Sequence, residues 1–402
     1  MRLILLLGVA SLVAACFDPH DPEFSGDAAP GGADAASGSP ESDGAPGPTA
    51  AVTCGGIAGV QSINDEAAWI GGNIVTVRGG VDFNQNGYLG SRWAFHMEGG
   101  RLTTAIEPTV TSGIALELLS PWEGSELVVK VDITGVEVEL RDHGSVMSTG
   151  EGDHDGDGAA IEISVEDGLL RVASAPIGET PVVIFEQPAP TWVRSSYLLL
   201  ERFDYLAGEA APRVRELVGH GPGAAPCKAE ELVDPFDALD PITWRWTDGC
   251  TPTANGMLSV PIGGGSPSTC FVRAHYAYKL RGSRAALELP NTPGVVVALR
   301  AWNPGTNKSV RLAIVDDELR LLSGVSSPWE VDETIELDTS RIRWLALKEA
   351  GGQIHWETSA DGVTWDDQYR TAVSLDLEHV VIGFDVEDDI GAGTAMIQGF
   401  GH

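Results

Sequence analysis

Short runs of residues in which apolar and polar side chains alternate recur along most of the chain. Residues 125–133 and 161–165 show this best, because Leu, Val and Ile alternate there with Glu, Lys, Asp and Ser. A period of two places the apolar residues on one face of a β-strand. Clusters of Gly, Pro, Asn and Asp separate the runs, which is typical of all-β sandwiches. The pattern predicts an all-β fold of antiparallel β-sandwiches, with one short helix at residues 211–218.

The most strongly apolar run lies at the N-terminus, over residues 3–12. It is shorter than the roughly 20 residues that cross a bilayer. Its length fits the apolar region of a secretion signal, which spans about 7–15 residues. The following Val13-Ala14-Ala15-Cys16 resembles the lipobox of bacterial lipoproteins. The resemblance implies a signal peptide over residues 1–15 and a lipid on the Cys16 thiol; the alternative is an ordinary cleaved signal with an incidental cysteine.

Residues 16–52 form a segment of Asp, Ala, Gly, Pro and Ser that contains no Lys or Arg. Its apolar surface is too small to offset the entropy of ordering, so we expect a disordered acidic tether. Proline and acidic repulsion keep such a chain extended. We therefore expect a lipid anchor at Cys16 that ties a folded body to the cell envelope. Phe17 and Asp18 favour the outer membrane in the enterobacterial sorting pattern, which leaves the periplasmic or surface face open.

The chain has 402 residues and a formal net charge of −33, from 58 acidic and 25 basic residues. Such acidity argues against nucleic acid as a partner, because binding phosphates requires a basic face. Beyond the signal and the tether, about 350 residues exceed what a single core usually organises. We predict a first β-sandwich domain over residues 53–226 and a second over residues 227–402. A Gly/Pro-rich joint at residues 221–226 marks the boundary.

Two pairs of segments in these halves resemble each other. Residues 135–141 match residues 294–300, and residues 165–171 resemble residues 315–320. The match predicts a tandem repeat of one β-sandwich. The alternative is chance similarity between β-segments.

Four cysteines remain besides Cys16: Cys54, Cys227, Cys250 and Cys270. An even number in an exported protein indicates disulfides, and four cysteines allow three pairings. We favour Cys250–Cys270, which are close in sequence and flanked by strand-like segments, together with Cys54–Cys227. No pair has the spacing of a zinc site.

The second half carries the more specific pattern, in residues 234–244, 341–347, 354–365 and 380–384. Their order resembles the concanavalin A-like lectin/glucanase jelly rolls, including laminin-G-like modules, over about residues 233–402. The resemblance implies a jelly-roll sandwich. It implies no single activity, because that superfamily contains lectins, hydrolases and adhesion modules.

Residues 359–365 read Ser-Ala-Asp-Gly-Val-Thr-Trp between two runs of β-formers. Asp361-Gly362 predicts a hairpin turn, in which Ser359 and Asp361 accept hydrogen bonds from backbone N–H groups. We expect Trp356 and Trp365 to cover one face. The alternative is a sugar-binding or catalytic role for Asp361 and Glu357.

Asp153, Asp155 and Asp157 alternate before a glycine, as at the start of an oxygen-rich calcium loop. An EF-hand would place a glutamate where this chain has Ser164, so that motif is excluded. Calcium is thus a candidate cofactor, and a solvated acidic loop is the alternative. Residues 82–88 repeat the spacing with weaker ligands, for which an Asx-rich turn is the simpler account.

No recognisable catalytic motif occurs: the chain lacks a Gly-x-Ser-x-Gly elbow, a His-Glu-x-x-His helix, a phosphate loop and a dinucleotide fingerprint. We predict a membrane-anchored envelope lipoprotein whose non-catalytic β-sandwiches bind a glycan or a protein partner. Trp302, Trp329 and Trp365 are candidates for exposed rings that stack on sugars, although each also fits a core position. A structural or adhesive envelope component with no small ligand, or an unrecognised glycoside hydrolase, is the alternative.

Overall fold

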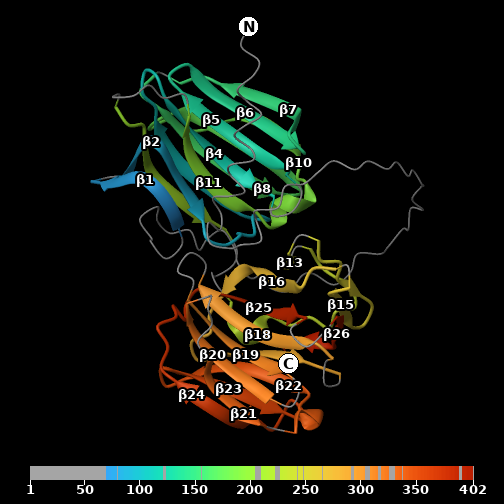
Figure 1. Cartoon of the computed structure of the whole chain (residues 1–402). Helices are drawn as coiled ribbons and strands as arrows, with labels where there is room; N and C mark the ends of the chain where they lie inside the picture. Colours follow the sequence, from blue (N-terminus) through green and yellow to red (C-terminus); the bar gives the residue numbers. More distant parts are fainter. Residues whose placement is uncertain are drawn as a thin grey trace, which may run out of the picture. The chain divides into compact units, whose positions relative to one another are not determined.

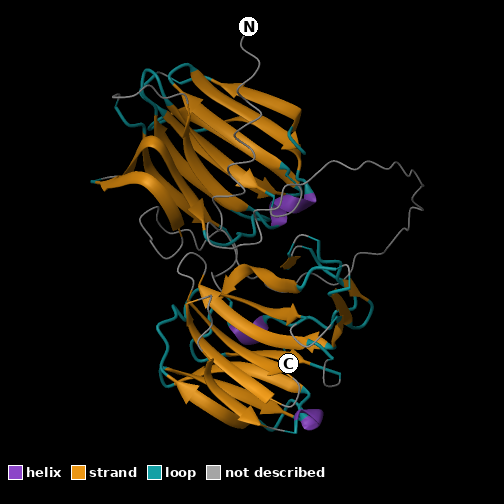
Figure 2. Cartoon of the chain, in the orientation of Figure 1, coloured by secondary structure: helices purple, strands orange, loops and turns teal. Residues whose placement is uncertain are grey.

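The computed structural model describes residues 69–401 apart from short gaps at 79, 121–123, 155, 204–209, 222–226, 242, 248, 265, 291–293, 304–307, 316–317, 326–330, 337 and 389–391. Within these ranges the regular structure is β-strand, apart from three single-turn 3-10 helices at Thr191–Arg194, Ala229–Glu231 and Thr339–Arg341 (Figure 2). In the same ranges, no helix has the length and apolarity needed to span a bilayer. The predicted all-β fold is confirmed.

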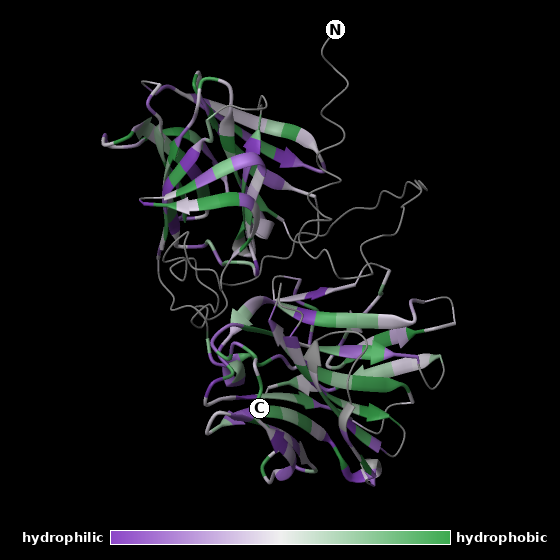
Figure 3. Cartoon of the chain, turned by 60° about the vertical axis from the view of Figure 1, so that its left-hand side comes forward, coloured by the Kyte–Doolittle hydropathy of each residue, from purple (hydrophilic) through white to green (hydrophobic). Residues whose placement is uncertain are grey.

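The first twelve strands form one antiparallel sheet in the order β10-β9-β8-β3-β12-β2-β11-β4-β5-β6-β7, with β1 attached to β2. These strands alternate in hydropathy, as Figure 3 shows along the ribbons. Their bounds are Trp69–Val77, Gly80–Ser91, Arg101–Glu107, Gly113–Leu119, Glu126–Asp132, Gly135–Asp142, Ser145–Gly152, Ala159–Glu166, Leu169–Pro176, Val182–Pro188, Tyr197–Phe203 and Arg213–His220.

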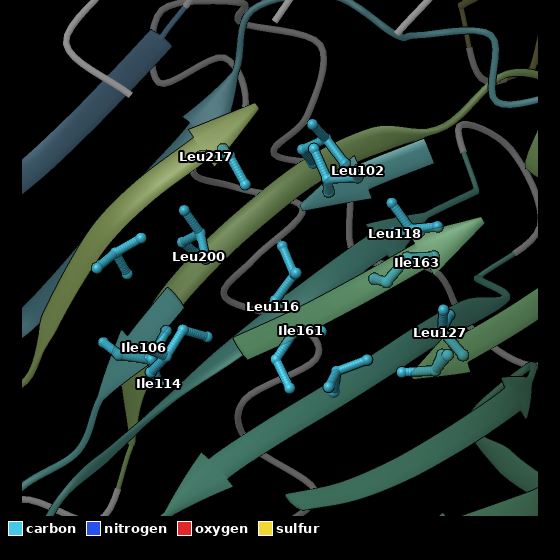
Figure 4. Close-up of a cluster of buried hydrophobic side chains, with 14 of the residues drawn as sticks. Leu102, Ile106, Ile114, Leu116, Leu118, Leu127, Ile161, Ile163, Leu200 and Leu217 are labelled. Carbon is cyan, nitrogen blue, oxygen red and sulfur yellow. The ribbon is translucent and has the colours of Figure 1, made fainter. Parts of the chain in front are cut away.

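This sheet folds over on itself around a single apolar core. Strands β8 and β4 are not neighbours, yet Ile161 of β8 and Leu116 of β4 belong to one buried cluster. Figure 4 shows this cluster, in which leucine and isoleucine side chains from β3, β4, β5, β8, β11 and β12 gather. The two end strands also approach each other, since a side chain at Gly150 of β7 would meet the backbone of Ile184 in β10. One continuous sheet therefore supplies both layers.

The remaining strands form a sandwich of separate sheets (Figure 1). The seven-stranded sheet has the order β13-β16-β25-β18-β19-β20-β21, and the five-stranded sheet has the order β24-β23-β22-β17-β27. Strands β14, β15 and β26 form a third, smaller sheet. Bounds from β13 to β27 are Trp244–Trp246, Thr253–Ala254, Leu258–Ile262, Thr269–Tyr278, Arg284–Glu288, Val296–Asn303, Lys308–Val315, Glu318–Val325, Val331–Glu336, Trp344–Ala350, Gln353–Ser359, Asp366–Thr371, Val380–Glu387, Gly393–Ile397 and Gly399–Phe400.

Aromatic side chains join the seven-stranded and five-stranded sheets across their shared core. Trp244 of β13 packs against Phe400 of β27, with ring centroids 5.2 Å apart. Trp356 of β23 is fully buried and donates its indole N–H to the Arg311 carbonyl of β19 at 3.0 Å. A buried indole gains stability when its N–H finds such a partner. These contacts make the two sheets a β-sandwich, as predicted for this half.

The predicted helix at residues 211–218 is wrong, because Arg213–His220 forms strand β12. Its buried residues Val214 and Leu217 are three apart, which imitates the helical period. A β-bulge between Val214 and Glu216, where β12 pairs with β3, produces that spacing. A bulge inserts one residue and shifts the alternation, so an apolar period of three arises within a strand.

The two halves differ in strand pairing, so the repeat predicted from the sequence is not a repeat of the whole topology. Residues 294–300 overlap β18, which pairs directly with β19. The matching residues 135–141 lie in β6, which pairs with β5 and β7, whereas β8 pairs with β3 and β9. Only the hairpins β8–β9 and β19–β20 correspond, because local turn chemistry repeats more readily than long-range pairing. The predicted boundary segment is residues 221–226, of which residues 222–226 lie outside the described residues, so the boundary stays a prediction.

The predicted disulfide between Cys250 and Cys270 is confirmed, with a Cα–Cα distance of 5.9 Å. It joins the segment after β13 to the start of β16, and both cysteines are buried. Cys227 is also disulfide-bonded. Cys54 lies outside the described residues, so the Cys54–Cys227 pairing stays a prediction, as does the lipidation of Cys16.

Candidate functional site

A row of arginines crosses the seven-stranded sheet. Arg245 of β13 lies opposite Arg273 of β16, which lies opposite Gly383 of β25. Gly383 lies opposite Arg300 of β18, which lies opposite Arg311 of β19. Directly opposite residues on paired strands share one face of a sheet. We refer to Arg245, Arg273, Arg300 and Arg311 as the arginine row.

The arginine row lies on the outer face of this sheet, away from the sandwich core. Successive side chains along a strand point to opposite faces. Leu299 next to Arg300, Leu312 next to Arg311 and Phe384 next to Gly383 are all buried. Phe384 packs against the core residue Trp244. The arginines therefore point to the other side of the sheet, where Asp385 and the Arg311 side chain are nonetheless buried.

Two carboxylates on β25 share this outer face. Asp385 and Glu387 follow Gly383 at alternate positions, so their side chains point the same way as the row. Arg311 lies 3.2 Å from Asp385 (Nε to Oδ2) and 2.6 Å from Glu387 (Nη2 to Oε1). Arg300 Nη1 lies 3.9 Å from Asp385 Oδ1. Both carboxylates are therefore held by guanidinium groups rather than presented alone.

Aromatic rings stack against the arginines. The guanidinium of Arg300 lies 4.8 Å from the centroid of Trp302 and 5.6 Å from that of Phe271. Arg273 lies 5.8 Å from the Trp302 centroid. These distances fall within the cation–π range of about 6 Å. Trp302 is only 9% exposed, so the prediction of an exposed stacking ring is wrong there, because two arginines cover it. Phe271 is half-buried, and Trp329 lies outside the described residues.

Part of this outer face is apolar. Val296, Ala298, Ala313 and Val315 form a small buried cluster on β18 and β19. Ala298 lies opposite both Asp385 and Ala313, so the cluster adjoins the carboxylates. The face thus combines apolar contact, flat aromatic rings and planar cations. Planar guanidinium groups bind carboxylates well, and here Arg311 binds the carboxylates of Asp385 and Glu387.

The predicted calcium loop stays a prediction. Asp153 and Asp157 flank a turn in which His154 binds the Asp132 carbonyl through Nε2 at 2.6 Å and accepts the Gly156 N–H at Nδ1. Asp155 lies outside the described residues. Across the described part of the chain, no three His, Cys, Asp or Glu residues converge in a way that could hold a metal ion. In the weaker candidate at residues 82–88, Asp82 instead forms an ion pair with Arg213 at 2.6 Å.

The predicted turn at residues 359–365 has the expected contacts. Ser359 Oγ accepts the Gly362 N–H at 2.9 Å. Asp361 Oδ1 accepts the N–H groups of Val363 and Thr364 at 2.8 and 2.7 Å. The hydrogen bonds from Thr364 and then Val363 lower the pKa of Asp361. Turn formation therefore accounts for these residues without a ligand.

The two tryptophans near this turn lie on opposite faces of the five-stranded sheet, so the prediction that they cover one face is wrong. Trp356 points into the core, whereas Trp365 packs outside against Trp344, Ala286 and Ala346. Trp365 lies two residues before Asp367, which is opposite Glu357, so the alternation of the strand places Trp365 on the face of Glu357. Glu357 is buried on the outer face and forms an ion pair with Arg284 Nη2 at 2.8 Å. This contact gives Glu357 a structural role.

A second pair of acidic residues lies on the first sheet. Burial, followed by the charges of Glu201 and Glu126, raises the pKa of Glu117 on β4 well above its usual range. Burial also raises the pKa of Glu201 on β11, which is hydrogen-bonded to Glu117. A glycosidase needs about 5–10 Å between its carboxyl groups to accommodate the sugar. Carboxyls in direct contact leave no such space, so this pair does not have the spacing of a glycosidase.

Replacing Glu117 with glutamine is expected to raise the Tm at about pH 7. A folded carboxyl with a raised pKa binds a proton that the unfolded chain releases above about pH 4.5, so the wild type loses stability as the pH rises through the folded pKa. Glutamine keeps the hydrogen bond without the charge. Calorimetry between about pH 4 and pH 8 tests this, and the difference in Tm should vanish at the acid end. Glu137→Gln, at an exposed position on β6, is the matched control. A Tm for E117Q that follows the wild type at every pH would contradict the expectation.

Sequence reasoning missed the arginine row. Arg273, Arg300 and Arg311 each occupy a polar position in an apolar strand, which is a visible signal. Strand order and register align these arginines. That information is long-range and absent from any local pattern.

No family model and no curated protein matches the chain. Among solved structures, an apo Crh5 transglycosylase shares 12% identity, with 43% of this chain and 88% of that chain covered and a TM-score of 0.32. A prokaryotic β-1,3-1,4-glucanase (lichenase) derived from a mouse hindgut metagenome shares 14% identity, covering 42% and 96%, with a TM-score of 0.33. The Ca²⁺/Man3GlcNAc-bound VIP36 exoplasmic/lumenal domain shares 11% identity, covering 43% and 92%, with a TM-score of 0.32. The activity of this chain is therefore inferred from its own residues.

Proposed function

We propose that the chain is a lipid-anchored envelope protein whose β-sandwich body binds a glycan or protein partner without catalysis, and that a glycan is the ligand of the arginine-row face. One observation carries the glycan assignment: the half-buried ring of Phe271 lies beside the guanidinium of Arg300 on a sheet face outside the core. Sugars are bound by aromatic faces together with polar side chains. The anchor is proposed at Cys16, in the outer membrane, on its periplasmic or surface side.

The carboxylates support binding rather than hydrolysis. Asp385 and Glu387 are both ion-paired with Arg311. Glu117 and Glu201 contact each other directly. A glycosidase needs one carboxyl group as an acid and another positioned across the sugar. Neither described pair offers that arrangement.

A structural or adhesive envelope component is the second candidate. The observation that favours it is the pairing of Arg300 and Arg311 with Asp385, which stabilises the sheet without any ligand. In that case the ion pairs on this face of the sheet have a purely structural role, and the face binds no small ligand.

Binding of the purified full chain to a glycan array, with and without a chelator, tests the proposal. We expect binding, weakened about threefold to tenfold by Phe271→Ala through loss of aromatic contact. Val363→Ala, which trims an exposed residue of the 359–365 turn, is the control and should bind like the wild type. Binding lost on chelation would support the calcium prediction. Absence of binding to every glycan would favour the structural candidate, and release of reducing sugar would overturn the non-catalytic assignment.

A further inference from the structure

One peptide bond in the second half of the chain combines an acidic side chain, a proline and a strained neighbour. Asp234 precedes Pro235, and Phe236 follows with a φ of +53°. A positive φ is rare for a bulky residue and costs free energy that the surrounding packing must offset. The Phe236 ring supplies that packing, because it is fully buried against Trp244 and Phe384. Backbone strain is therefore held next to the Asp234–Pro235 bond.

Two hydrogen bonds fix the Asp234 carboxyl group on the side of its own peptide bond. Its Oδ1 accepts the N–H of Phe236, two residues further on, at 2.7 Å. Such an Asx turn directs the side chain toward the peptide bond between Asp234 and Pro235. Its Oδ2 accepts the indole N–H of the buried Trp244 at 2.6 Å. The carboxyl group is thus oriented for closure of a five-membered ring onto the adjacent carbonyl carbon.

The carbonyl group of Asp234 has a hydrogen-bond donor on a distant segment. Asp234 and Phe400 of β27 form an antiparallel bridge, in which the Phe400 N–H donates to the Asp234 carbonyl at 2.8 Å. Gly401 lets this segment approach closely, since a side chain there would meet the backbone of Leu232. A fixed N–H group stabilises negative charge that develops on the oxygen it contacts.

Asp234 keeps its acid form to a higher pH than an ordinary aspartate does. Burial raises its pKa, and the charges of Asp240 and Asp237 add to this effect. The hydrogen bonds from Phe236 and Trp244 act in the opposite direction without reversing it. A fraction of the protonated carboxyl therefore exists in mild acid.

The charged groups on the neighbouring strands lie away from this carboxyl or are paired. Arg245 follows the core residue Trp244 in β13, so it points to the opposite face. Glu288 of β17, the strand beside β27, forms an ion pair with Arg343 at 3.5 Å. The acidic residues of its own loop are therefore the charges that act on Asp234.

We propose that the chain cleaves itself at the Asp234–Pro235 bond in mildly acidic solution. A carboxyl oxygen of Asp234 attacks the carbonyl carbon of the same residue and forms a cyclic anhydride, while the bond to the Pro235 nitrogen breaks. The carboxyl proton passes to that nitrogen, which leaves as a secondary amine. Water then adds to the anhydride and restores the Asp234 side chain beside a new terminal carboxyl group. Pro235 is exposed, so water reaches this bond, and its departure relieves the strain at Phe236.

Cleavage would divide the chain ahead of the second sandwich. Residues 235–402 contain the strands β13 to β27, whereas the anchor proposed at Cys16 precedes the cut. Cys250 and Cys270 pair with each other inside residues 235–402, and the other three cysteines all precede residue 234. The two fragments therefore separate on a non-reducing denaturing gel.

A second bond of the same type, Asp240–Pro241, is an internal control. The Asp240 carbonyl accepts the N–H groups of Thr243 and Trp244 at 3.2 and 2.9 Å, and both donors belong to the segment that would leave. Breaking this bond would displace its own donors, whereas the donor at Asp234 lies on β27 and stays in place. We therefore expect cleavage at Asp234 to be at least about tenfold faster in the folded chain.

Incubation of the purified full chain between about pH 4 and pH 7, followed by intact mass measurement, tests the proposal. We expect a fragment that begins at Pro235 and ends at His402, formed faster as the pH falls. In denaturing urea the folded geometry is lost, so the two Asp–Pro bonds should react at similar, slower rates. A native chain that stays intact, or that is cut equally at both bonds, would overturn the proposal.

Pro235→Ala should slow cleavage at this site at least about tenfold, because an alanine nitrogen is a poorer leaving group than a prolyl nitrogen. The matched control Pro241→Ala should change the rate less than about twofold. The same fragment formed at an unchanged rate in P235A would indicate a contaminating protease and overturn the proposal. A Tm close to that of the wild type verifies the fold of each variant, and the comparison of native with urea-unfolded wild type needs no variant.

Discussion

Replacing Asp385 with asparagine is expected to lower the free energy of unfolding by about 3 kcal/mol or more, because it removes a buried counter-charge that Arg300 and Arg311 share. Asp385 is 2% exposed, and the Arg311 side chain is 6% exposed. Arg300 and Arg311 would then face each other without the Asp385 charge beside them. Denaturant unfolding followed by tryptophan fluorescence measures the loss.

An exposed ion pair on the same sheet provides the control for this prediction. Glu318 and Arg320 are 3.4 Å apart, and their side chains are about two-fifths exposed. Glu318→Gln should cost less than about 1 kcal/mol, since solvent screens exposed pairs. The double variant Arg311→Leu with Asp385→Leu should lose less stability than the two single changes together, because it removes both buried charges. A loss for D385N no larger than for E318Q would show that the buried network contributes little.

Removing the Cys250–Cys270 disulfide by replacing both cysteines with serine is expected to cost about 3 kcal/mol. The two residues are 20 apart in sequence, and the bond restricts that loop in the unfolded chain. It also fixes the segment after β13 against β16, the strand that carries Phe271 and Arg273. The shift in the unfolding midpoint under oxidising conditions measures this.

Two further variants separate the bond from the polarity of its replacement. A Cys→Ala pair at the same positions removes the bond without burying hydroxyl groups, and should lose a similar amount. Adding a reductant to either variant then reports on the remaining disulfide at Cys227. An unchanged midpoint in both variants would mean that the sheet contacts alone hold this loop.

Much of the local structure follows from the sequence. Alternation at residues 125–133 and 161–165 predicted strands that the structure contains as β5 and β8. Turn chemistry predicted the contacts of Ser359 and Asp361. These features depend on residues within a few positions of one another, so the physical cause is present in the local sequence. The Cys250–Cys270 disulfide was also predictable from local sequence, because the two cysteines are only 20 residues apart.

The predictions that were wrong, and the arginine row that the sequence did not reveal, depend on long-range strand pairing. Residues 211–218 looked helical because a bulge against β3 shifted the alternation, and the bulge exists only in the paired sheet. Trp356 and Trp365 lie on opposite faces because the pairing of β23 with β24 places Trp365 on the face of Glu357, the residue next to Trp356.

By itself, the sequence determined a strongly acidic, all-β protein and predicted an N-terminal secretion signal that resembles those of lipoproteins, since composition, alternation and signal length are properties of the linear chain. Only the tertiary structure decided that Arg245, Arg273, Arg300 and Arg311 share one row, and that Trp302 lies beneath two of them. Strand order and register align side chains from distant segments, and a shift of one residue would turn each to the other face. The candidate glycan site is a product of that register.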